Sequence, residues 1–73
     1  MKYIPGHQFK VNKRIIQGKV KKFFFTGKTY VIFAINRKNN EYVYVFSDGI
    51  NKFEFNFPDA VTAEGMIEYL ASA

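Results

Sequence analysis

Three runs of alternating apolar and polar residues constrain the fold of this chain more than any other feature. The runs cover residues 29–37, 41–47 and 52–57, and only short segments rich in Asn, Asp and Gly separate them. Because side chains on a β-strand point alternately to opposite faces of the sheet, a period of two indicates strands. The short connections make these strands antiparallel neighbours, so we expect a meander of hairpins.

The turn residues fix which side chains share a face. Asn39 and Asn40 suit the two left-handed positions of a type I′ hairpin turn. This turn pairs Lys38 with Glu41, Arg37 with Tyr42, Ile35 with Tyr44 and Phe33 with Phe46. A loop of either two or four residues around Asp48 and Gly49 keeps the aromatic side chains of residues 41–47 and 52–57 on one face. The predicted core face comprises Val20, Val31, Phe33, Ile35, Tyr42, Tyr44, Phe46, Phe53, Phe55 and Phe57.

The N-terminal half also alternates, and residues 8–12 and 15–25 are predicted as two further strands. A turn at Thr26-Gly27 would pair Phe23 with Tyr30. The prediction is therefore an α+β, β-rich fold with four or five antiparallel strands in a single domain spanning residues 1–73. Gly18 could bend the long second strand, which would curl the meander into a small SH3-like or OB-like barrel. An open sheet and a barrel both remain possible at this point.

The C-terminal segment changes its period from two to that of a helix. Ala63, Met66, Ile67 and Leu70 recur at the spacing of one helical stripe, so we expect one C-terminal helix of about ten residues. Thr62 is the predicted N-cap, which would place Val61 and Met66 as a hydrophobic staple. The stripe is expected to cover the sheet.

Composition excludes several kinds of chemistry. The chain has no Cys and one His, so neither a disulfide nor a Cys/His zinc site can form, and we expect no metal and no cofactor. No nucleophile stands beside a base and no paired carboxylates occur, which predicts a non-enzymatic protein. The chain lacks both a signal-peptide pattern and the roughly 20 consecutive apolar residues of a membrane span. A cytoplasmic protein without a membrane partner is the expectation.

Charge is strongly segregated along the chain. Residues 1–40 hold ten of the eleven Lys and Arg residues and none of the six Asp and Glu residues. Like charges held close together cost free energy unless a partner neutralises them, so this asymmetry indicates a polyanionic partner. The alternative is a solvated basic surface that only keeps a small protein soluble.

Basic and aromatic residues interleave on the second, mixed face of the predicted sheet. Cations contact phosphates and flat rings stack on bases, and this combination is typical of proteins that bind single-stranded nucleic acid. The alternative is that Phe23, Phe25 and Tyr30 are buried by the N-terminal strand or by the helix. The candidate residues for binding nucleic acid or an acidic partner are Lys10, Lys13, Arg14, Lys19, Lys21, Lys28, Phe23 and Tyr30.

The second functional hypothesis is a small interaction or inhibitor protein that binds an acidic surface of a larger protein. A sheet edge, the charged face or the helix could supply the contact, and the first and last strands could pair in a homodimer. The abundance of Lys, Asn, Phe, Tyr and Ile is typical of an AT-rich genome. A short basic chain of this composition suits a phage-like or mobile-element accessory protein.

Overall fold

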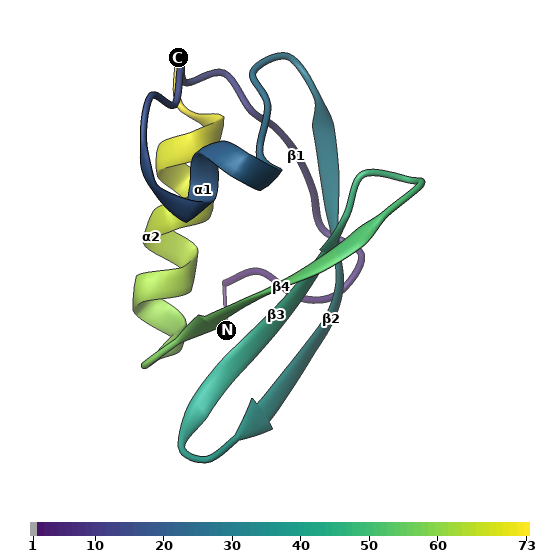
Figure 1. Cartoon of the computed structure of the whole chain (residues 1–73). Helices are drawn as coiled ribbons and strands as arrows, with labels where there is room; N and C mark the ends of the chain where they lie inside the picture. Colours follow the sequence, from purple (N-terminus) through teal and green to yellow (C-terminus); the bar gives the residue numbers. More distant parts are fainter. Residues whose placement is uncertain (1) are drawn as a thin grey trace.

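A computed structural model describes residues 2–73 and shows one four-stranded antiparallel sheet with two helices on the same face (Figure 1). The strands follow one another in space in chain order, as a meander does. The elements are β1 (Gln8–Lys10), α1 (Gly18–Phe23), β2 (Thr29–Lys38), β3 (Glu41–Ser47), β4 (Lys52–Phe57) and α2 (Ala60–Ala71).

The β2–β3 hairpin has the predicted turn. Asn39 and Asn40 have φ angles of 52° and 63°, which are the left-handed values that a type I′ turn requires. Near the turn the register is also as predicted, with Lys38 opposite Glu41, Arg37 opposite Tyr42 and Ile35 opposite Tyr44.

Further from the turn, an irregularity between Ile32 and Ala34 changes the register of β2. Ile32, rather than the predicted Phe33, lies opposite Phe46. Because one extra residue in a strand exchanges its two faces, Tyr30 and Ile32 point into the core. Phe33 is 56% exposed. The assignment of Val31 and Phe33 to the core face is therefore wrong.

The β3–β4 hairpin settles the length of the second loop. Ser47 lies opposite Lys52, so four residues connect the strands. The aromatic face predicted for these two strands is confirmed: Tyr44, Phe46, Phe55 and Phe57 are buried, and Tyr42 and Phe53 are partly buried.

The prediction of a long second strand over residues 15–25 is wrong, because residues 18–23 form helix α1. Val20, Phe23 and Phe24 have the spacing of one helical face, and all three pack on the core. The pairing of Phe23 with Tyr30 is therefore absent. Since the segment that would close a barrel is helical, the sheet is open, and the SH3-like or OB-like barrel is not formed.

Helix α2 covers the sheet with the predicted stripe. Ala63, Ile67 and Leu70 are buried, and Met66 is partly buried. The N-cap is Asp59 instead of Thr62: an Asp59 carboxylate oxygen accepts the Thr62 backbone N–H at 2.7 Å. This earlier start leaves the Val61 side chain exposed, so the predicted staple is wrong as well.

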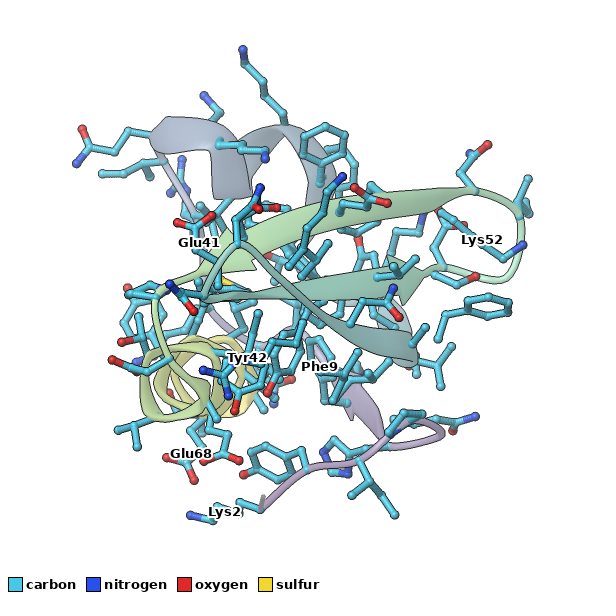
Figure 2. The ribbon with its side chains drawn as sticks, turned by 90° about the horizontal axis from the view of Figure 1, so that it is seen from below. Lys2, Phe9, Glu41, Tyr42, Lys52 and Glu68 are labelled. Carbon is cyan, nitrogen blue, oxygen red and sulfur yellow. The ribbon has the colours of Figure 1, made fainter. Side chains whose placement is uncertain are left out.

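The C-terminal end of α2 is held by two segments that come earlier in the chain. The Leu70 carbonyl accepts the backbone N–H of Asn12 at 2.8 Å, and the Ala71 carbonyl accepts the Asn12 side-chain amide at 2.8 Å. Glu68 accepts hydrogen bonds from the Lys2 ammonium and the Tyr3 hydroxyl (Figure 2). Across residues 2–73, neither helix is long and apolar enough for a membrane span.

Candidate functional site

The positive charge gathers at the end of the molecule that carries α1. Residues 10–28 contain seven basic and no acidic residues, and they form α1 and the two segments that flank it (Figure 1). In the part of the chain that the structure describes, Lys28 is the one cation of this segment that forms an ion pair, with Asp48. Within residues 2–73 the other cations of this segment have no Asp or Glu side chain at ion-pair distance, and the Lys13 ammonium donates to the Ala73 carbonyl at 3.4 Å.

A hollow of about 230 Å³ lies between the end of α1 and the start of β4, and we call it the α1 hollow. Phe23 from α1 stacks on Phe53 from β4, with ring centroids 4.9 Å apart. These two rings give the hollow an apolar side. Its lining residues are Lys22, Phe23, Phe25, Asp48, Asn51, Lys52 and Phe53.

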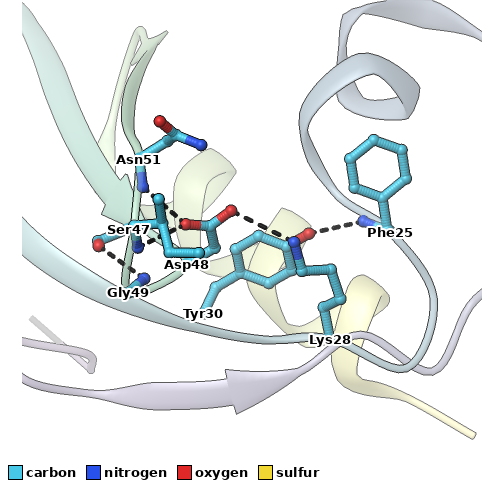
Figure 3. Close-up of polar contacts among 8 residues, drawn as sticks. Phe25, Lys28, Tyr30, Ser47, Asp48, Gly49 and Asn51 are labelled. Carbon is cyan, nitrogen blue, oxygen red and sulfur yellow. Dashed lines mark hydrogen bonds and ion pairs between the residues drawn. The ribbon is translucent and has the colours of Figure 1, made fainter.

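Phe25 offers an accessible aromatic ring at the α1 hollow. The residue is 52% exposed, and its backbone N–H donates a hydrogen bond of 2.8 Å to the Tyr30 hydroxyl. Figure 3 shows the Phe25 ring turned away from this hydroxyl. The Lys28 ammonium lies 5.7 Å from the ring centroid. A buried side chain thus fixes the backbone that presents the exposed ring.

Asp48 neutralises only one of the nearby lysines. Backbone N–H groups of Asn51 and Ile50 donate to its carboxylate at 2.8 and 2.9 Å, and Lys28 binds the second oxygen at 3.3 Å (Figure 3). These hydrogen bonds lower the pKa of Asp48 to about 2, the Asn51 bond contributing most. The carboxylate is therefore ionised at neutral pH and paired with Lys28. Among the described residues, Lys22 and Lys52 line the hollow without an ion-pair partner, and the Lys52 ammonium lies 4.6 Å from the Phe33 ring centroid.

The predicted aromatic platform is only partly present. Tyr30 is 1% exposed, so it cannot stack on a ligand, and the register change in β2 is the reason. Phe23 is partly buried against Phe53. The alternative of burial thus holds for Tyr30, and the accessible ring is that of Phe25.

The predicted cations lie in separate places. Lys21 is exposed on α1, while the Lys19 ammonium lies 4.6 Å from the Phe55 ring centroid. The Lys13 ammonium lies 5.4 Å from the Tyr69 ring centroid, near the end of α2. Lys10 is exposed on β1, where the neighbouring Phe9 takes the buried position. Of the predicted set, only Phe23 lines the α1 hollow, and Lys28 adjoins it through its contacts with Asp48 and the Phe25 ring.

Sequence reasoning missed Phe25, Lys22 and Lys52 as site residues. A signal was present in the three consecutive Phe residues at positions 23–25. Neither a strand nor a helix can turn three consecutive side chains toward one core, so one of these rings had to be accessible.

No group of three or more His, Asp or Glu side chains within residues 2–73 is arranged to hold a metal ion. Comparison with protein families, with curated proteins and with solved structures gave no match. The functional argument therefore depends on the residues of this chain and their geometry.

Proposed function

We propose that this protein is a small, basic, non-enzymatic binding domain that binds single-stranded nucleic acid at the α1 hollow. The observation that supports the proposal is the exposed Phe25 ring, which lines the same hollow as Lys22 and Lys52 and has the Lys28 ammonium 5.7 Å from its centroid. Base stacking on an aromatic ring and phosphate contacts to lysines are the two interactions that sequence-tolerant single-strand binding requires.

In this proposal an unpaired base stacks on Phe25. Lys22 and Lys52 contact the phosphates on either side, and Lys21 on α1 adds a further contact. A base inside a duplex is already stacked on its neighbours, so this mode favours single strands. The six residues of α1 make a helix only about 9 Å long, which is short for reading a major groove.

Binding to a labelled oligothymidine of about 12 nucleotides tests the proposal by fluorescence anisotropy, with a duplex of equal length for comparison. We expect the single strand to bind more tightly and the affinity to fall steeply with salt. Equal affinity for the two nucleic acids would contradict stacking of an unpaired base.

Phe25→Ala is expected to weaken oligothymidine binding by about 5- to 150-fold, since stacking contributes about 1–3 kcal/mol per base. The matched control is Tyr69→Ala on α2, because Tyr69 is similarly exposed and also has a lysine, Lys13, against its ring, while neither residue belongs to the proposed interface. The control should retain its affinity. A loss in Tyr69→Ala alone would place the stacking ring on α2 instead.

A second candidate function is binding to an acidic surface of a larger protein. It is favoured by a separate surface, where the exposed apolar side chains of Ile16 and Tyr69 lie beside cations. A pulldown from lysate, with and without nuclease, separates the two candidates. Partners lost after nuclease treatment support the first, and a defined protein that is retained supports the second.

A further inference from the structure

A second and larger hollow lies on the other side of α1. It has a volume of about 390 Å³ and runs between residues 14–17, α1 and the C-terminal half of α2. These three parts of the chain lie side by side in Figure 1. Its lining shares no residue with the α1 hollow. We call it the α2 groove.

The lining of the α2 groove is mainly apolar. Ile15, Val20, Met66 and Leu70 contribute side chains that also contact the core. Ile16 lines the same groove and is 68% exposed, so a large aliphatic side chain meets water here. Covering such a side chain removes apolar area from water and is favourable by about 25 cal/mol per Å².

Charge distinguishes the α2 groove from an ordinary gap between helices. Arg14 lines it, Lys13 lies over the ring of Tyr69, another lining residue, and no carboxylate belongs to the lining. Glu68 on α2 is bound to Lys2 and Tyr3 instead. The groove therefore combines an apolar lining with positive charge.

We propose that the α2 groove binds an acidic protein segment that inserts one large apolar side chain beside Ile16 and Tyr69. Carboxylates flanking that side chain would pair with Lys13 and Arg14. Charge complementarity selects this occupant: the groove combines apolar surface with the Arg14 and Lys13 cations, and the remaining polar groups of its lining are the Gln17 amide and the Tyr69 hydroxyl. Tyr69 is the one ring in a lining whose other apolar side chains are aliphatic, whereas three Phe rings line the α1 hollow, so nucleic acid fits the α1 hollow better. This inference deepens the second candidate function and is independent of the nucleic-acid proposal.

The chemistry is tested by NMR titration of the isotope-labelled protein with a synthetic peptide rich in Asp and Glu that carries one Leu. A peptide with Ser in place of Leu has the same charge and serves as the control. We expect shifts at the methyl groups of Ile15, Ile16 and Met66, and an affinity at least about tenfold higher for the Leu peptide. Equal affinities would mean charge attraction alone and would overturn the proposal.

A variant then tests the location. Ile16→Ser should weaken binding of the Leu peptide by about tenfold and leave oligothymidine binding unchanged. Ile4→Ser is the matched control, because Ile4 is 62% exposed and lies outside the groove. Thermal unfolding of both variants checks that the fold is kept. Peptide-induced shifts at Phe25 and Lys22, or no shifts at all, would overturn the assignment.

Discussion

The two helices lie on the same face of the sheet but are held there in different ways. Helix α2 has twelve residues, a side-chain N-cap at Asp59 and three buried residues. Helix α1 has six residues, no side-chain cap and no fully buried residue. Its attachment depends on the residue that follows it, Phe24, which is 1% exposed and packs against five aromatic rings.

This difference allows one helix to contribute stability and the other to bind a ligand. Most side chains of α1 contribute little to the core, so its lysines can serve a ligand without weakening the fold. The buried side chains of α2 are needed to cover the sheet. A short helix held mainly by one large aromatic anchor therefore suits a binding surface, and the longer capped helix suits a structural role.

The largest expected effect follows loss of the anchor of α1. Phe24→Ala should lower the free energy of unfolding by about 3–5 kcal/mol, because it removes a fully buried ring and leaves a cavity. Chemical denaturation monitored by circular dichroism measures the change. The neighbouring Phe25→Ala should cost no more than about 1 kcal/mol, since that ring is half exposed. Similar losses in both variants would contradict the anchor role.

Removal of the cap of α2 should have the next largest effect. Asp59→Ala is expected to lower the melting temperature by about 4–8 °C, since the Thr62 N–H loses its acceptor. Asp59→Asn should remain close to the wild type at neutral pH, because Asn is an equally good N-cap. A melting temperature unchanged by Asp59→Ala would show that tertiary packing alone fixes the start of α2.

The same cap predicts a pH dependence. The hydrogen bonds from Thr62 lower the pKa of Asp59 below its unfolded value, so their stabilisation is present above that value and is lost as the pH falls through the folded pKa. Asp48 and Glu68 contribute in the same direction, since their pKa values are also lowered. Wild-type stability should therefore fall below about pH 4. Thermal melts should show a shallower fall for Asp59→Asn.

A smaller loss of stability is expected from a change at Tyr30, whose hydroxyl supports the backbone of the exposed Phe25. Tyr30→Phe removes the acceptor of the Phe25 N–H and should lower the free energy of unfolding by about 0.5–1.5 kcal/mol. Because this hydrogen bond fixes the backbone of Phe25, oligothymidine affinity should fall as well, although Tyr30 touches no ligand. Unchanged affinity in the folded variant would show that the hydroxyl does not position the ring.

The smallest change in stability is expected on the surface of α1. Lys21→Ala should alter the free energy of unfolding by no more than about 0.5 kcal/mol. If Lys21 contacts a phosphate, the slope of log affinity against log salt should decrease by about 1. Lys38→Ala, at the far end of β2, is the control. An unchanged slope for Lys21→Ala would remove this residue from the proposed interface.

The two hairpins formed by β2, β3 and β4 were largely predictable, because alternation and turn chemistry act locally. Asn39 and Asn40 fixed one turn, and the aromatic faces of β3 and β4 followed from the period of two. The irregularity near Phe33 was not predictable. One extra residue in a strand leaves the hydrophobic pattern locally plausible in either register, and packing against the helices selects between them.

For the candidate site, the sequence by itself determined that the positive charge lies in the first forty residues and that rings accompany it. The tertiary structure decided which rings are accessible. Residues 18–25 fit both a strand and a helix period, and the burial of Phe24 among β-sheet aromatics favours the helix. That choice exposes Phe25, and the shifted register of β2 buries Tyr30. Local pattern limits which side chains can share a face, whereas only competition for one small core decides which of them reach it.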